Sequence, residues 1–212
     1  MKRNLDFEDI SDGKRYSCDS QAPVGTHGCS GCCECCKNTE DTIFLDAYDF
    51  YSLQKATGKT FETLMNEGVI NLQVSEGLIV PYLMKKGNGS CIFLSENERC
   101  NIHEYRPGFC RMFPLGRIWN DDGSFDYFLQ VHECPVSDKE LVTVKDWIGI
   151  PSFHKYEKFV IKWHELCNAI KLYALKPNHE HVVKSCNMQL LNRFFVEPYD
   201  TSKDFYEQFW AR

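Results

Sequence analysis

A run of cysteines near the N-terminus is the feature of this sequence best suited to chemistry. Five cysteines, Cys29, Cys32, Cys33, Cys35 and Cys36, fall within eight residues. Cys29, Cys32 and Cys35 form a C-x2-C-x2-C motif, in which a tight turn can aim successive sulfur atoms at one centre. Reduced thiols crowded in this way oxidise easily unless a metal holds them as thiolates. The run therefore predicts metal binding rather than disulfide formation.

A second group of cysteines lies further along the chain. It consists of Cys91, Cys100, Cys110 and Cys134, and Cys134 is followed by Pro135. With four sulfurs of the first run, the chain offers eight thiolates, enough for two complete four-thiolate sites. Because Cys35 and Cys36 are neighbours, their side chains point in different directions on any regular backbone. They therefore suit two nearby centres, or different metals of one polynuclear cluster.

The sequence around the second group resembles a known family. The stretches 91–94, 100–102, 105–107 and 110–114 are similar to the second signature of the YkgJ-type CxxCxxCC cysteine-cluster family, and the first run is similar to its first signature. The resemblance covers residues 29 to about 135. It implies a zinc- or iron-chelating domain with the ligands Cys29, Cys32, Cys35, Cys36, Cys91, Cys100, Cys110 and Cys134. One relative, the flagellin lysine-N-methylase, is an iron–sulfur protein that transfers a methyl group to lysine.

Two residues depart from the family pattern. Cys33 is an extra thiol inside the first signature, and His103 stands where the family more often has tyrosine. Cys29, Cys33 and Cys36 also match the C-x3-C-x2-C spacing of radical-SAM enzymes. The chain lacks the repeated βα units of the radical-SAM barrel, so we interpret this spacing as a coincidence within a run of cysteines. We expect His103 and His132 to donate hydrogen bonds near the cluster rather than to bind metal.

Two arginines are candidates for positions just outside the ligands. Four thiolates on Zn²⁺, or on an iron–sulfur cube, leave a net negative charge that nearby cations stabilise. Arg106 and Arg111 lie inside the second signature and are expected to supply this charge. Catalytic residues are not predicted, because no phosphate loop, dinucleotide fingerprint or Ser-His-Asp set is present.

The spacing of the cysteines leaves the identity of the cofactor open. C-x2-C-x2-C with a remote Cys-Pro resembles bacterial ferredoxin ligation and favours a 4Fe-4S iron–sulfur cluster. Widely separated cysteine pairs are instead the habit of structural zinc sites. We expect an iron–sulfur protein, with a structural zinc module and an iron–sulfur enzyme of redox or lysine methyl transfer chemistry as alternatives. Metal delivery would require an exposed and exchangeable site.

The composition narrows the partners and the location. The chain has 212 residues and a formal charge of −6, with no run of lysine and arginine, so nucleic acid is not an expected partner. No apolar run reaches the roughly 20 residues needed to cross a bilayer, and residues 1–10 lack the apolar core of a signal peptide. These features predict a cytoplasmic protein without membrane contact. The aromatic C-terminal segment 205–210 is expected to be a docked helix, or else a surface for a protein partner.

The remaining patterns predict an α+β fold in a single globular unit. We expect an irregular arm (1–28), a cysteine-cluster metal-binding domain (29–135) and a helical region packed on it (136–212). Predicted helices span residues 46–56, 60–67, 152–176 and 179–194, with a short one from 202. Predicted strands span residues 43–45, 78–83, 91–94, 116–119 and 125–130, separated by turns that include 87–89 and 121–123. Cys167 and Cys186 are expected to pack as small apolar side chains on their helices, and Cys18 to be a spare thiol.

Overall fold

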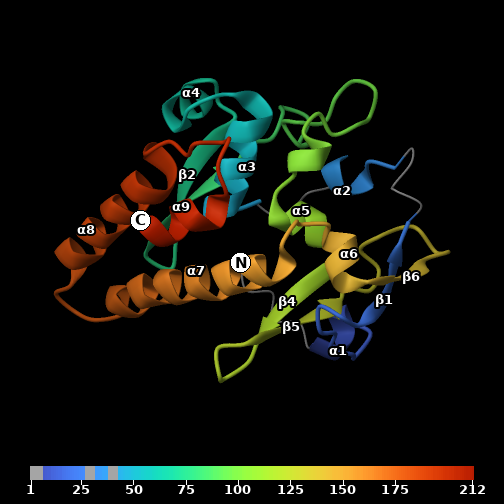
Figure 1. The fold of residues 1–212 in the computed structure, drawn as a ribbon. Coiled ribbons are helices and arrows are strands. Elements are labelled where there is room, and N and C mark those ends of the chain that lie inside the picture. Colours follow the sequence, from blue (N-terminus) through green and yellow to red (C-terminus); the bar gives the residue numbers. More distant parts are fainter. Residues whose placement is uncertain (1–6, 27–31, 38–42) are drawn as a thin grey trace.

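The computed structural model describes residues 7–26, 32–37 and 43–212 of the chain. Within these ranges the fold is α+β, as expected, with helices and three two-stranded antiparallel sheets, ordered β1-β6, β2-β3 and β4-β5. The helices α3, α4, α7, α8 and α9 gather on one side of the molecule, and α2, α5 and the β1-β6 sheet lie on the other (Figure 1). No helix of the described residues is long and apolar enough to cross a membrane.

Two consecutive helices follow the first cysteine run and begin and end where the sequence predicts. α3 (Ala47–Thr57) has a capping box, in which the side chains of Asp46 and Asp49 each accept a hydrogen bond from the other's backbone N–H. It ends at Gly58, whose φ of 68° is the left-handed conformation that glycine adopts without strain. α4 (Phe61–Asn66) begins at Thr60, whose side chain accepts from the Thr63 N–H. Both predicted helices are confirmed.

The next element is a hairpin that the sequence analysis found only in part. β3 (Leu78–Leu83) is confirmed, but it pairs with β2 (Ile70–Ser75), a strand that was not expected. The predicted strand at 43–45 is reduced to a single bridge between Phe44 and Tyr82. The buried Asn187 of α8 holds the hairpin, since its side chain accepts from the Ile79 N–H at 2.8 Å and donates to the Gly77 carbonyl at 2.9 Å. The hairpin therefore belongs to the helical side of the molecule.

The predicted strand at 91–94 is wrong, whereas the two that follow are right. β4 (Leu115–Trp119) and β5 (Phe125–Leu129) pair through the expected turn at 121–123. Residues 91–94 instead form a tight turn, in which the Leu94 N–H donates to the Cys91 carbonyl at 3.0 Å. Isolated bridges, Lys85 to Cys91 and Leu94 to Cys100, and single backbone hydrogen bonds hold this segment in place of a strand ladder. An apolar four-residue run is too short to distinguish a strand from a turn packed on a small core.

The N-terminal arm has more structure than the sequence analysis expected. It contains α1 (Phe7–Ile10) and β1 (Gln21–Gly25). β1 pairs with β6 (Glu140–Thr143), which leads directly into α6 (Val144–Ile148). The expectation of an irregular arm is therefore wrong for these residues, because Ala22 and Val24 are fully buried in the core and pin the segment to the sheet.

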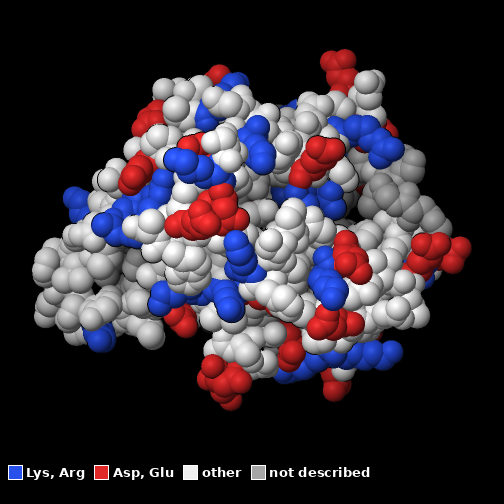
Figure 2. Space-filling view, in the orientation of Figure 1, with Lys and Arg blue, Asp and Glu red and all other residues white. Residues whose placement is uncertain are grey.

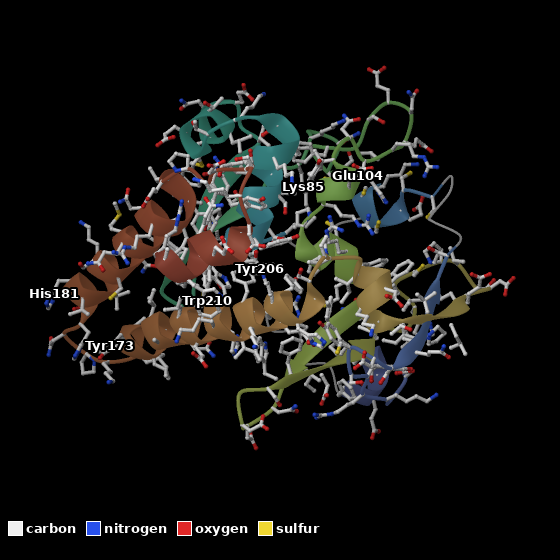
Figure 3. All side chains as sticks on the ribbon, in the orientation of Figure 1. Lys85, Glu104, Tyr173, His181, Tyr206 and Trp210 are labelled. Carbon is white, nitrogen blue, oxygen red and sulfur yellow. The ribbon has the colours of Figure 1, made fainter. Side chains whose placement is uncertain are left out.

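The C-terminal third is helical and aromatic. α7 (Phe153–Ala174) and α8 (Glu180–Leu191) confirm the two predicted long helices, and α8 continues into the π-helical turn η3 (Asn192–Val196). α9 (Phe205–Ala211) lies across α7 and buries Phe205, Tyr206 and Phe209 (Figures 1 and 3). The terminal aromatics thus form a docked helix, although Trp210 stays 54% exposed.

Candidate metal centre

α2 (Glu34–Lys37) is a single helical turn that presents the described part of the first cysteine run. The turn is closed by the carbonyl of Cys33, which accepts from the Cys36 N–H at 2.8 Å and from the Lys37 N–H at 3.0 Å. The carbonyl of Cys36 in turn accepts from the Cys91 N–H at 2.8 Å. This last bond joins the two cysteine groups directly, across more than 50 residues of sequence.

Turns rather than long strands position the second cysteine group. The Asn101 N–H donates to the Phe93 carbonyl at 2.9 Å, and the Ser95 N–H donates to the Arg99 carbonyl at 2.8 Å, which folds 91–101 back on itself. The short helices η2 (His103–Tyr105) and α5 (Gly108–Met112) follow, and Cys110 lies on α5. Figure 1 shows α2 and α5 close together on this side of the molecule, and Figure 3 shows sulfur atoms between them with Glu104 nearby.

Five of the predicted ligands lie within electrostatic reach of one another. They are Cys35, Cys36, Cys91, Cys100 and Cys110, from α2, the 91–101 segment and α5. Burial raises the pKa values of Cys91, Cys100 and Cys110, and the charges of neighbouring thiolates raise them further. Thiolates that repel one another in this way are stabilised by a bound cation. We call these five residues the thiol group.

Within the thiol group the neighbours Cys35 and Cys36 have opposite shifts. A hydrogen bond between their side chains lowers the pKa of Cys35 to about 7 and raises that of Cys36. The positive charge of Arg106 lowers the pKa of Cys35 as well, although burial works against this. One of the two sulfurs is thus already disposed to be a thiolate at neutral pH.

The side chains of the thiol group are close but do not form a finished coordination shell. Within residues 7–26, 32–37 and 43–212, no three His, Cys, Asp or Glu side chains are arranged to hold a metal ion. Of the other predicted ligands, Cys29 lies outside the described residues. Cys32 is half-buried just before α2, and Cys134 is half-buried in bends between β5 and β6. The described contacts do not link Cys32 or Cys134 to the thiol group.

The two predicted arginines have different surroundings. The charge of Arg106 lowers the pKa values of Cys35 and Cys100, so this arginine faces the thiol group. Arg111 is buried and its Nε donates to the Arg106 carbonyl at 3.0 Å, while another donor reaches the Glu104 carbonyl. Arg111 therefore fixes the backbone that carries Arg106. His103, whose pKa is lowered by burial and by nearby arginines, lies in the same segment.

A buried polar network beneath α5 was not predicted from the sequence. Asp49 of α3 is 4% exposed and accepts a hydrogen bond from the Gly108 N–H at 2.7 Å. A Cβ atom on Gly108 would lie 2.7 Å from the Tyr156 hydroxyl, which accepts from Arg117 at 2.6 Å. Burial raises the pKa of Asp49 well above its usual value, with the charge of Asp46 adding to the effect. The sequence at this point predicts only a helix that begins at residue 46, and nothing in it indicates the role of Asp49.

The donor set suits a thiophilic metal. The thiol group supplies only sulfur, and soft thiolate ligands favour zinc and iron–sulfur clusters over the hard cations that oxygen ligands bind. The positive charge of Arg106 acts on Cys35 and Cys100, and a centre with several thiolate ligands benefits from such a charge nearby. The residues present therefore fit a zinc or iron–sulfur centre. Elsewhere, acidic and basic side chains intermix over the face shown in Figure 2 without a continuous basic area.

Fold and thiol group together define an α+β protein with a cysteine cluster assembled from segments far apart in sequence. A sequence model of the CxxCxxCC family, described as "Putative zinc- or iron-chelating domain", matches residues 28–140, more than half of the chain. The chain belongs to this family. The matched range contains both groups of cysteines and ends at the first residue of β6. No curated protein and no solved structure matches the chain.

Proposed function

We propose that this protein holds an iron–sulfur cluster through cysteine thiolates. The proposed ligands are Cys29, Cys32, Cys35, Cys36, Cys91, Cys100, Cys110 and Cys134. One observation supports the proposal: five of these cysteines lie within electrostatic reach of other members of the thiol group although they come from three separate segments of chain. Membership of a zinc- or iron-chelating family supports it.

The arrangement of Cys35 and Cys36 favours a polynuclear centre. The charge of Cys35 raises the pKa values of Cys91 and Cys100. The charges of Cys91 and Cys100 in turn raise the pKa of Cys36. Two sulfurs on adjacent residues reach a single ion only with difficulty, but they can bind different iron atoms of one cluster. An iron–sulfur cluster would supply one-electron transfer or the electronic activation of a bound group. The chain's own part is to bring the sulfurs together, to shield Cys91 and Cys110 from water, and to place Arg106 beside the negative charge.

A structural zinc site is the second candidate. It is favoured by the sparse backbone order around the thiol group, where single bridges and one-turn helices predominate. A closed four-thiolate zinc site stabilises such segments directly, because binding free energy becomes folding free energy. An iron–sulfur enzyme remains a proposal without a substrate. Two open hollows of the described residues lie along α7, near Trp119 and Phe125, and no cysteine lines either of them.

Anaerobic purification followed by metal and sulfide analysis tests the proposal. We expect iron and acid-labile sulfide in similar amounts, together with broad visible absorption that is lost when the cluster is destroyed with acid. Zinc without sulfide or colour would replace the iron–sulfur proposal by the structural zinc site. Protein that stays free of iron and zinc after anaerobic reconstitution would exclude both.

A further inference from the structure

Cys33 is the member of the first cysteine run that the proposed ligand set omits, yet it is the most deeply placed of those described. It is 5% exposed, whereas Cys35 is exposed and Cys32 and Cys36 are half-buried. It forms a small core with Cys91 and Leu94, separate from the main core, and Cys36 and Phe93 pack against it. A residue treated as a spare thiol by its spacing thus lies at the junction of the two cysteine groups.

The geometry of α2 explains this position. Because the Cys33 carbonyl accepts from the Cys36 and Lys37 N–H groups, residues 33–37 form one helical turn. Residues three apart on such a turn share a face, so Cys33 and Cys36 present their side chains together. The hydrogen bond from the Cys91 N–H to the Cys36 carbonyl docks the second cysteine group on that turn. Cys33-x2-Cys36 is therefore a second two-residue-spaced pair, interleaved with Cys32-x2-Cys35.

The surroundings of the Cys33 sulfur differ from those of a thiol buried only for packing. Lys37 and Glu98 form an ion pair at 2.5 Å. Their mutual hydrogen bond raises the pKa of Lys37 and lowers that of Glu98, and the nearby Cys33 adds to both shifts. The pair is partly exposed. Cys167, by comparison, is half-buried on the α7 stripe and packs against the main core.

We infer that Cys33 is a thiolate ligand of the metal centre, acting together with Cys36 and Cys91. The inference rests on the proposed function and adds one ligand to it. On binding, the Cys33 S–H bond would break, its proton would pass to water, and the sulfur would form the bond to the metal. The ligand count of the first run then rises by one, and the spacing signature of the family no longer describes the site completely.

Cobalt binding by the full-length protein tests this inference. Co²⁺ is the probe because its sulfur-to-metal charge-transfer absorption grows with the number of thiolate ligands. Reduced, metal-free wild type would be titrated anaerobically beside Cys33→Ser, Cys33→Ala, Cys91→Ser and Cys167→Ser. Cys91→Ser removes a proposed ligand, and Cys167→Ser removes a half-buried thiol outside the thiol group.

If Cys33 binds metal, both Cys33 variants lose charge-transfer intensity and bind Co²⁺ at least about tenfold more weakly. Mutating a residue that only orients a ligand already weakens metal affinity by about tenfold or more, so the loss of a ligand should cost at least as much. Thermal unfolding of the metal-free proteins serves as the folding control, and the loss should persist in whichever Cys33 variant unfolds like wild type. Cys33 variants that match Cys167→Ser while Cys91→Ser loses binding would overturn the inference and leave the proposed function standing. If Cys91→Ser also binds like wild type, the proposed function fails and this inference fails with it.

Discussion

Helices α3, α7 and α9 meet through aromatic rings. On the cysteine side, α2 joins the 91–101 segment through thiols and the backbone hydrogen bond from Cys91 to Cys36. Phe159 of α7 is fully buried, with its ring centroid 4.8 Å from that of Phe209 and 5.1 Å from that of Phe205. Contacts of this kind bury large apolar area and stabilise the fold without help. The small core around Cys33, Cys91 and Leu94 contains no ring that is fully buried.

The difference shows which region depends on a ligand. The aromatic side follows the usual balance, in which burial of apolar surface offsets the entropy of ordering the chain. The cysteine side has short elements and several buried thiols whose charges oppose one another. A metal that binds these thiolates supplies the stabilisation that the small core lacks. The two regions touch at Gly108, where α5 rests on Asp49 and Tyr156.

The largest stability loss is expected on the aromatic side. Phe159→Ala deletes a ring that touches both α9 and the rest of α7, and should lower the free energy of unfolding by about 3–5 kcal/mol. Chemical denaturation of metal-free protein measures this loss. Metal bound per folded chain should be unchanged under mild conditions. If Phe159→Ala lowers the free energy of unfolding by less than removal of the metal does, the aromatic region is not the more stabilising of the two.

The buried carboxylates at the start of α3 predict a dependence of stability on pH. Burial raises the pKa of Asp46 from 3.8 to about 6, so the folded protein keeps this proton at pH values where the unfolded chain has lost it. Stability should therefore be highest near pH 4 and fall as the pH rises through 6. Asp46→Asn keeps the helix cap and should remove part of this fall, at most about 3 kcal/mol. Asp49, shifted in the same direction, accounts for the remainder.

Denaturation of metal-free protein between pH 4 and 8 measures this effect, with the exposed Asp121→Asn as the matched control. The control should keep the wild-type slope. A slope that is identical in Asp46→Asn and wild type would mean that Asp46 is ionised throughout this range in the folded protein.

The contact between the two regions is tested by adding one methyl group. In Gly108→Ala the new Cβ would lie 2.7 Å from the Tyr156 hydroxyl, so α5 and the buried Tyr156 of α7 must move apart. We expect a stability loss of about 1–3 kcal/mol and a weaker affinity for Co²⁺, because Cys110 moves with α5. Gly123→Ala meets no atom within 4 Å but is strained by the φ of 82° at this position, so it is the control for a loss of stability that does not touch the thiol group. If Gly108→Ala and Gly123→Ala bind Co²⁺ with equal affinity, metal binding by the thiol group does not depend on how α5 packs at Gly108.

The smallest effect is expected for a thiol outside the thiol group. Burial raises the pKa of Cys167 to about 12, which fits an inert thiol on the α7 stripe. Cys167→Ala should cost about 1 kcal/mol of stability, as for other small deletions in a core, and leave metal content unchanged. Cys186→Ala should behave alike, since Cys186 also packs against the main core. Metal analysis of both purified variants checks this, and a drop in bound metal would bring that cysteine into the ligand set.

The sequence predicts best where local chemistry and burial agree. Asp46 and Gly58 give the limits of α3 because capping is decided by a few neighbouring residues. β1 was missed because its Pro23 and Gly25 resemble a loop, and only pairing with β6 orders it. β2 was missed although Ile70, Leu72 and Val74 alternate with polar residues, a signal that could have found it.

The candidate site was predicted in its residue types but not in its geometry. The spacing of the cysteines indicates metal binding, because thiolate chemistry depends on residue type. It does not indicate which face of a one-turn helix is buried, so Cys33 was set aside while the exposed Cys35 was retained. The role of Asp49 beneath α5 depends on a contact across 59 residues, which no local pattern reveals.

Hydrogen exchange on metal-loaded and metal-stripped protein, under reducing conditions, tests the central claim most directly. We expect amides in residues 32–37 and 84–112 to lose protection when the metal is removed. These include the Cys91 N–H, which bonds to the Cys36 carbonyl. Amides of α3 and of α7 around Phe159 should keep theirs, because aromatic packing holds them. Equal protection of 84–112 in both forms would contradict the account, since it would mean that the cysteine side is stable without the metal.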